Sequence, residues 1–452
     1  MSREHFSSRS TAVLAMAGSA IGLGNIWRFP YMVGENGGAA FILVYLLATL
    51  LLSLPIFFSE SIIGRATHQG TIGAMKTLAP GTAWRHMGLL TVLSPLIILS
   101  FYSVVGGWSV EYLLKSLTFD FQGATQEDLG AAFGGFIAST WGPLVCHTVF
   151  LSLCALIILA GVKKGIEQFS KYTMPLLFLL IVVIMVYSLS LPGASEGVKY
   201  LLKPDFSRLK ASSVAAAMGQ SFFSLSLGVG TILTYSSYIR KEENLLSSGV
   251  GTAAFDLGFA LIAGFAVMPA VFAAGIAPGA GPGLLFETLP YIFSKMGTNL
   301  PWLSSLVAVL LFVTVLVAAL TSAISMFEVG VTFLVEERGV KRSRATGLIF
   351  LGTWALGCLC SLSFGPLDGI RLFGKNIFGF CDALTANFLM TFGGLLFTLF
   401  VGWKMKKEQV RDEFTCGGQL RFSARIFPAV YFLIRWIAPA VILLIFVTNL
   451  LL

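Results

Sequence analysis

About eleven runs of mainly apolar residues follow one another along the chain, and each is long enough to cross a membrane as a helix, which takes roughly 20 residues. Only 12% of the residues are charged and 56% are hydrophobic, whereas a soluble domain carries about 25% charged residues. Disordered and coiled-coil proteins are excluded as well, because both need polar or charged sequence. We therefore predict an all-α polytopic membrane protein. The expected spans cover residues 10–34, 39–64, 87–117, 142–161, 168–191, 212–239, 245–273, 301–335, 344–364, 376–403 and 427–451.

The net charge of +8 belongs to the connections between the apolar runs and does not indicate a nucleic-acid-binding surface. Basic residues gather in every second connection, and the positive-inside rule places these connections in the cytoplasm. The N-terminus is then cytoplasmic, and an odd number of spans puts the C-terminus outside. The basic residues concerned are Arg65, Lys76 and Arg85, then Lys163 and Lys164, Arg240 and Lys241, Arg338, Lys341, Arg342 and Arg344, and finally Lys404, Lys406, Lys407 and Arg411.

Two expected spans are interrupted by glycine at matching positions of the two halves. The first reads AMAGSAIGLGNIWRFP (15–30) and the sixth reads GQSFFSLSLGVGTILTYSSY (219–238). Such glycines serve close helix packing in many membrane proteins, which is one interpretation. The other is an unwound helix, and the polar Asn25 and the Ser-x-Ser at 224–226 favour it. Unwinding frees carbonyls and amides that lipid cannot satisfy, so a ligand or ion must, as in inverted-repeat transporters.

Enzyme chemistry has no support in the sequence. The six cysteines and four histidines are scattered without the spacing of a disulfide framework or a zinc site. No nucleophile with a neighbouring base is apparent. We expect that the chain is not an enzyme.

The two interrupted stretches resemble the neurotransmitter:sodium symporter family, in particular its bacterial amino-acid transporters. KGIEQFSKYTMP (164–175) and LTSAISMFE (320–328) add to a similarity that runs from Arg3 to about residue 451. The resemblance implies a LeuT-like fold, in which an inverted 5+5 repeat has discontinuous helices 1 and 6. Its parts would be a first repeat (1–191), an external loop (192–211), a second repeat (212–403) with an external lid (274–300), and a cytoplasmic loop with helix 11 (404–452).

The function implied by this resemblance is sodium-coupled import of neutral hydrophobic or aromatic L-amino acids by alternating access, in the bacterial inner membrane. The expected partners are the amino acid, sodium ions and the lipid bilayer, without nucleic acid. Two alternatives remain open: an amino-acid sensor that does not transport, and a proton-coupled carrier of the same fold.

Two sodium sites are implied, and both use oxygen ligands, as hard cations prefer. The first would consist of the Ala20 carbonyl, the Asn25 amide oxygen, Ser224, Asp256 and the substrate carboxylate. The second would consist of the carbonyls of Gly18, Ile21 and Ala318 with the hydroxyls of Thr321 and Ser322. Without the resemblance, these two hydroxyls would more often be satisfied by their own helix.

Asp256 lies inside an expected span, where an ionisable group indicates function because its charge is costly there. A protonated structural aspartate is the alternative. Chloride-dependent members of the family bind Cl− near this position, whereas chloride-independent members place a carboxylate there. Tyr45, Gln220 and Ser224 match the remaining positions of the chloride site. The resemblance thus implies that Asp256 provides the compensating negative charge and that no chloride is needed.

The substrate site would lie between the two breaks. Gly22 occupies the place of an aspartate in monoamine-transporting relatives, so the substrate must bring its own carboxylate. That carboxylate would meet the amides of Leu23 and Gly24 and the Tyr102 hydroxyl, and the ammonium would meet the carbonyls of Ala20, Phe223 and Ser224 and the Ser226 hydroxyl. The apolar side-chain pocket would consist of Ile98, Phe223, Val229, Ser322 and Met326. Val229 replaces a bulky aromatic residue of the bacterial leucine transporter, which favours larger substrates.

Gates are implied on both sides of this site. Tyr102 and Phe223 would close over the substrate, and Arg28 would pair with Asp382 above them, with Asp368 as the competing partner. On the cytoplasmic side Arg3 would pair with Glu336, with the neighbouring Glu337 as the competing partner. An exposed ion pair contributes only about 0–1 kcal/mol, which suits a contact that breaks in each cycle. Glu60 on span two is expected to form hydrogen bonds with the unwound segments.

Overall fold

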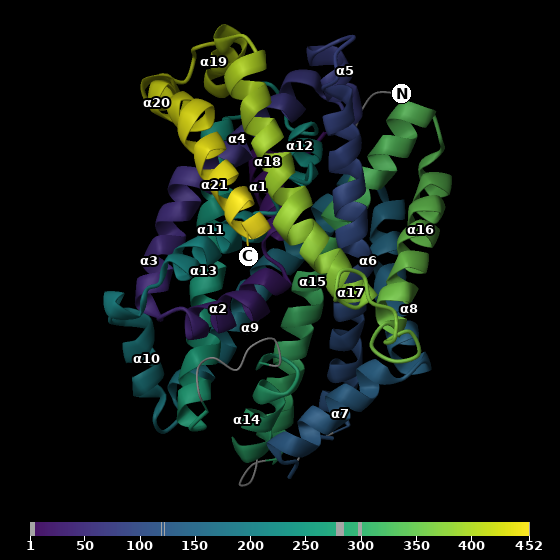
Figure 1. Ribbon diagram of the computed structural model, residues 1–452, viewed down its shortest axis with the longest axis vertical. Helices are drawn as coiled ribbons and strands as arrows, with labels where there is room; N and C mark the ends of the chain where they lie inside the picture. The colour runs from purple at the N-terminus through teal and green to yellow at the C-terminus, as the bar shows by residue number, and fades with distance from the viewer. Residues whose placement is uncertain (1–4, 119, 122, 277–283, 297–300, 452) are drawn as a thin grey trace.

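The computed structural model describes residues 5–118, 120–121, 123–276, 284–296 and 301–451, which form an elongated bundle of helices (Figure 1). In this described part, nine helices are long and apolar enough to cross a membrane. The pair formed by α1 (Arg9–Ala20) and η1–α2 (Gly24–Glu35), bent by 56°, makes a tenth. The broken helix of α11 (Ala211–Ser224) and α12 (Thr231–Ser236) takes the place of the expected sixth span. The predicted all-α fold with many membrane-spanning helices is confirmed.

The remaining spans follow the expected order closely. In the first half they are α3–η2–α4 (Ala39–Thr67), α6 (Arg85–Leu117), α8 (Trp141–Leu159) and η3–α9 (Val162–Leu189). In the second half they are α13 (Leu245–Ala273), α15 (Pro301–Arg338), α16 (Arg342–Leu362), α17–η6–α18–η7 (Ile377–Lys404) and α20–η8–α21 (Arg421–Leu451). The last helix begins at Arg421, before the expected residue 427.

Short helices cover the two ends of the bundle (Figure 1). One end carries α5 (Thr71–Leu78) and α19 (Lys407–Thr415). The opposite end carries α7 (Gln126–Ala138), α10 (Ala194–Leu202) and α14 (Thr288–Met296). The expected lid contains α14, while its residues 277–283 and 297–300 lie outside the described part.

The apolar surface of the bundle faces outward as well as inward, as a bilayer requires. On α8, Val145 and Val149 are half-exposed, whereas Phe150 and Cys154 on the neighbouring face are fully buried. Both faces are apolar, so the helix can contact lipid on one side and protein on the other. Helix α15 packs along α6 and also contacts α1, α8, α9 and α16, which places it near the centre.

Candidate functional site

The first span is interrupted where its glycines cluster. Helix α1 ends at Ala20, and Ile21 is extended, with ψ at 107°. The helical path resumes in the π-helical segment η1 (Gly24–Arg28), which leads into α2 (Phe29–Glu35). The backbone between Ala20 and Gly24 therefore leaves the regular helical hydrogen-bond ladder and presents polar groups to its surroundings.

The sixth span is interrupted between Ser224 and Thr231. Ser226, Gly228 and Gly230 have φ values of 52°, 81° and 73°, in the left-handed region that favours glycine. A Cβ atom on Gly228 would overlap the carbonyl of Met390 on α18, so this position also needs glycine for close approach. Ser226 adopts the same region with a side chain, and such strain is typical of functional sites.

The two interruptions contact each other inside the bundle. The Ser226 hydroxyl donates to the Ser19 carbonyl (3.0 Å), and the Gln220 amide donates to the Gly24 carbonyl (3.1 Å). Glu60, which is fully buried, accepts from the Gly228 amide (2.7 Å), in agreement with the supporting role expected from the sequence. The freed polar groups of both breaks thus meet around one shared space.

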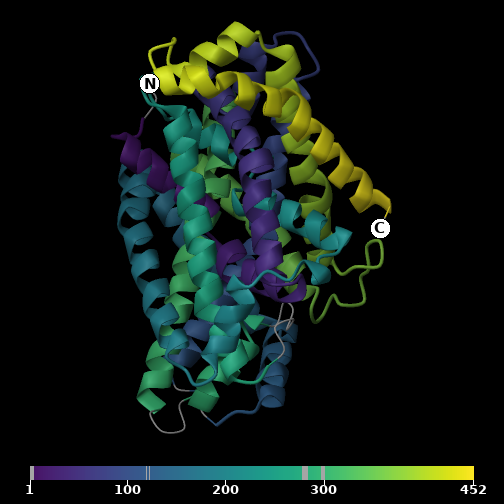
Figure 2. The ribbon, with the colours of Figure 1, turned by 90° about the vertical axis from the view of Figure 1, so that its left-hand side faces the viewer.

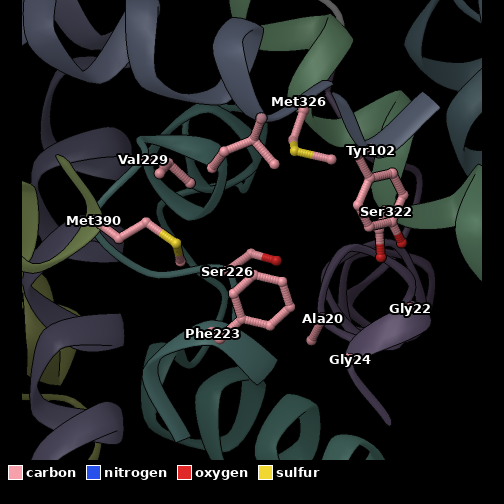
Figure 3. A pocket seen from close by; sticks show the side chains of 11 residues that line it. Ala20, Gly22, Gly24, Tyr102, Phe223, Ser226, Val229, Ser322, Met326 and Met390 are labelled. Atoms are coloured by element: carbon pink, nitrogen blue, oxygen red, sulfur yellow. The ribbon is translucent and has the colours of Figure 1, made fainter. Parts of the chain in front are cut away.

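That space is a cavity lined by most of the predicted substrate residues (Figure 3). Tyr102 and Ser322 place their hydroxyls beside the unwound segment that carries Gly22, and Met390 reaches in from the opposite side. Gly22 and Met390 were not among the predicted lining residues. The predicted residues that line it are Ala20, Gly24, Ile98, Tyr102, Phe223, Ser226, Val229, Ser322 and Met326.

Two predicted substrate residues do not line the cavity. The Leu23 amide donates to the Tyr102 hydroxyl (3.2 Å), which places this backbone group at the polar end of the cavity. Ser224 lies deeper, against Asp256. The polar end therefore consists of backbone groups and hydroxyls, and the cavity has no charged side chain in its lining.

Asp256 is fully buried and collects several donors. Its carboxylate accepts from the Asn25 side-chain amide (2.7 Å) and from the Ser224 hydroxyl (2.8 and 2.9 Å), and the Tyr45 hydroxyl lies 3.4 Å away. The Asn25 side-chain oxygen accepts from the Gly22 amide (3.2 Å). The structure thus brings together the side chains expected at the first sodium site, next to the unwound backbone that carries Ala20.

The residues expected at the second sodium site also converge. The Thr321 hydroxyl lies 3.2 Å from the Ile21 carbonyl and 2.8 Å from the Ala318 carbonyl, and the Ser322 hydroxyl lies 3.2 Å from the Ile21 carbonyl. Gly18 faces Thr321, since a Cβ atom on Gly18 would lie 3.4 Å from the Thr321 Cβ. The candidate cation ligands here are therefore carbonyl and hydroxyl oxygens, which suit a hard cation.

The predicted outer gate is described around Phe223. The Arg28 guanidinium lies 4.7 Å from the centre of the Phe223 ring. Asp368 pairs with the nearby Arg371 (2.9 Å) in an exposed connection. Among the described residues Arg28 forms an ion pair with neither Asp382 nor Asp368. The pairing of Arg28 with Asp382 stays a prediction.

The predicted inner gate is described only in part, because Arg3 lies outside the described residues. Glu336 accepts from the Gly70 amide (2.7 Å). A second ion pair nearby was not predicted: Arg342 contacts the fully buried Glu328 through both carboxylate oxygens (3.0 and 2.5 Å). The Tyr238 hydroxyl also donates to Glu328 (2.9 Å). This bidentate contact connects the start of α16 to α15, next to Tyr238 at the end of the sixth span.

Comparisons with known proteins cover nearly the whole chain. The model of the sodium:neurotransmitter symporter family matches residues 3–129 and 132–452. An uncharacterized sodium-dependent transporter of Bacillus subtilis, YhdH, is 40% identical over 98% of this chain and 96% of its own length. An uncharacterized sodium-dependent transporter of Haemophilus influenzae is 35% identical over 99% of this chain and 98% of its own length.

A solved structure shares the fold over nearly the same extent. The crystal structure of MhsT in complex with L-phenylalanine superposes with a TM-score of 0.90 at 39% sequence identity, and the match covers 99% of this chain and 100% of MhsT. With the membrane spans described above, these findings make the chain a multi-pass, sodium-dependent transporter and not an enzyme. The chain belongs to the sodium:neurotransmitter symporter family.

Proposed function

We propose that this protein is a sodium-coupled symporter that imports neutral hydrophobic or aromatic L-amino acids by alternating access. The observation that carries the proposal is the meeting of two unwound helices around a cavity that is polar at one end and apolar at the other. MhsT, which shares the fold, holds L-phenylalanine in its crystal structure.

The protein would hold the amino acid by its carboxylate and its ammonium group. Its carboxylate would accept from the Leu23 and Gly24 amides and from the Tyr102 hydroxyl, while its ammonium group would donate to carbonyls of the two breaks and to Ser226. Since no charged side chain lines the cavity, a charged substrate side chain would be left unpaired, which costs several kcal/mol. Ile98, Val229, Met326 and Met390 would contact an apolar side chain.

Sodium would occupy two sites. The first joins Asp256 and Asn25 to the substrate carboxylate, which couples ion binding to substrate binding. The second joins α1 to α15 through Ile21 and Thr321. An ion that bridges two helices stabilises only those conformations in which both are in reach, which is the differential binding that a conformational cycle needs.

The cycle would move the first repeat (1–191) against the second (212–403). The N-terminus would be cytoplasmic and the C-terminus outside, in the inner membrane of a bacterium, with the lid at 274–300 on the outer face. The basic connections support this orientation.

Binding measurements test the proposal. Scintillation-proximity competition with all twenty amino acids, in sodium and in choline, should show sodium-dependent binding of neutral apolar amino acids only. Unchanged affinity in choline would favour a proton-coupled carrier. Counterflow in proteoliposomes separates transport from sensing, because a sensor binds without exchange.

Replacing Val229 by phenylalanine should change which substrates fit. Val229 is buried and lines the apolar end of the cavity, so a larger ring there takes up the space of the substrate side chain. We expect the affinity for tryptophan to fall about ten-fold or more, while that for alanine changes less than about three-fold. Competition binding checks this, with Val229→Ile as the conservative control. Equal losses for both amino acids would contradict the assigned pocket.

Replacing Thr321 by valine should weaken sodium binding without changing the shape of the site. The variant keeps the branched side chain but removes the hydroxyl beside the carbonyls of Ile21 and Ala318. We expect the sodium concentration for half-maximal binding to rise about ten-fold, because one ligand of the cation is lost. Thr314→Val is the matched control, since Thr314 bonds only to Leu310 of its own helix (2.6 Å). An equal effect in both variants would contradict the sodium site.

A further inference from the structure

A guanidinium group packs against a pair of tryptophans on the last two spans. Arg435 belongs to the π-helical segment η8 (Leu433–Ile437). Its guanidinium carbon is 4.7 Å from the ring centre of Trp403 and 5.6 Å from that of Trp436, and the two rings contact each other edge to face, with their centres 4.6 Å apart. Both rings are about half exposed, at 52% and 49%. Arg435, Trp403 and Trp436 thus form a cation–aromatic cluster at the surface of the bundle.

The charge of Arg435 has no anionic partner in the part of the chain that the structure describes. Its Nε atom is buried and has no hydrogen-bond partner. No ion pair among the described residues includes it. A cation–π contact with two rings compensates a buried charge only in part, by about 0.5–2 kcal/mol for each ring. A membrane-facing cation of this kind needs an anion from outside the chain.

The cation–aromatic cluster lies at the end of the tenth span. Segment η7 (Phe400–Lys404) packs against η8: the Trp403 indole donates to the Arg435 carbonyl (3.0 Å), and the Tyr431 hydroxyl donates to the Gly402 carbonyl (3.1 Å). Lys404 ends the span directly after Trp403. Tryptophans are enriched at the membrane–water interface, which supports a position of the cluster at headgroup depth.

The neighbouring connection is basic. Residues 404–435 carry seven basic side chains and three acidic ones, and one of the acidic residues, Glu413, already pairs with Arg65 and Lys241. Besides Arg435, the basic residues are Lys404, Lys406, Lys407, Arg411, Arg421 and Arg425. Besides Glu413, the acidic residues are Glu408 and Asp412. The positive-inside rule places this connection on the cytoplasmic side, where the leaflet carries anionic lipids.

An apolar track continues from the cation–aromatic cluster along the last helix. Phe432, Trp436, Leu443 and Val447 are all exposed, and their spacing puts them on one face of the helix. Helices α20 and α21, in yellow, run down the outside of the bundle in Figure 2. Acyl chains could thus lie along the same helix that holds the cation.

We propose that Arg435, with Trp403 and Trp436, binds the phosphate of an anionic phospholipid of the cytoplasmic leaflet. The planar guanidinium matches two phosphate oxygens, and the rings hold it in place and exclude water. A phospholipid supplies the missing negative charge at headgroup depth and contacts the apolar track with its chains. The inference does not depend on which substrate the protein transports.

Native mass spectrometry of the full chain in detergent tests this, with phosphatidylglycerol and phosphatidylcholine added in turn. We expect the protein to retain phosphatidylglycerol preferentially, and Arg435→Gln to weaken its apparent affinity about five-fold or more. Arg425→Gln, which removes an exposed charge on the same helix, is the matched control and should change retention less than two-fold, on the order of the assay error. Trp436→Leu keeps the charge of Arg435 and should also weaken retention of the lipid. This second variant tests the site even if Arg435→Gln does not fold.

Several results would overturn the lipid site. Equal retention of both lipids by the unmodified protein would show that the protein does not distinguish lipids by the charge of the headgroup. Unchanged retention in Arg435→Gln and Trp436→Leu would place the lipid elsewhere. Displacement of the lipid by millimolar inorganic phosphate would assign the cation–aromatic cluster to a free anion. A dimer that disappears in Arg435→Gln would assign it to a second copy of the chain.

Discussion

Replacing Asp256 by asparagine is expected to abolish most transport in chloride-free medium and to make the remaining activity depend on chloride. The carboxylate is fully buried beside Asn25 and Ser224, at the proposed first sodium site. Removing a buried carboxylate that would pair with the bound sodium ion costs about 2–5 kcal/mol, which corresponds to a loss of about 30-fold or more in sodium affinity. Chloride held by the hydroxyls of Tyr45 and Ser224 would return part of the lost negative charge.

Uptake into proteoliposomes in chloride and in gluconate measures this effect. The unmodified protein should transport equally in both media, whereas Asp256→Asn should be stimulated several-fold by chloride. Asp368→Asn removes an exposed carboxylate paired with Arg371 and controls for a general effect of the substitution. Complete dependence of the unmodified protein on chloride would contradict the role given to Asp256.

The positions of the two helix breaks could be predicted because their causes are local. A glycine-rich stretch within an apolar run is visible in the sequence, and the left-handed residues Gly228 and Gly230 fall in the predicted segment. A polar residue that must face such a break, such as Asn25, is likewise uncommon enough in an apolar run to be noticed. The resemblance to a known family then assigned partners to them.

Residues whose orientation depends on tertiary packing could not be predicted in the same way. Met390 is one apolar residue among many in its span, and only the packing of α18 against the sixth span turns it into the cavity. Glu328 and Arg342 lie 14 positions apart across the connection from α15 to α16. The sequence shows four basic residues in that region, and nothing in their spacing indicates which of them returns to the buried carboxylate.

Replacing Gly22 by alanine is expected to abolish amino-acid binding. A Cβ atom there would lie 2.8 Å from the Tyr102 hydroxyl and would overlap the Ser322 hydroxyl even more closely. These groups and the unwound backbone form the polar end of the cavity, so none can withdraw without losing its own contacts. The added methyl group would occupy the place proposed for the substrate carboxylate, and we expect affinity to fall about 100-fold or more, in line with the 1–3 kcal/mol cost of overpacking plus the lost carboxylate contacts.

Gly219→Ala separates this steric effect from a general effect of alanine. Gly219 lies on α11 just before the second break, and a Cβ atom there meets nothing within 4 Å. The control should bind like the unmodified protein, and it should be slightly more stable, because alanine favours a helix over glycine by about 1 kcal/mol. Binding is measured by competition and folding by size-exclusion chromatography of both variants. If folded Gly22→Ala bound phenylalanine like Gly219→Ala, the carboxylate would have to lie elsewhere, because the methyl group and the carboxylate cannot occupy the same space beside Tyr102.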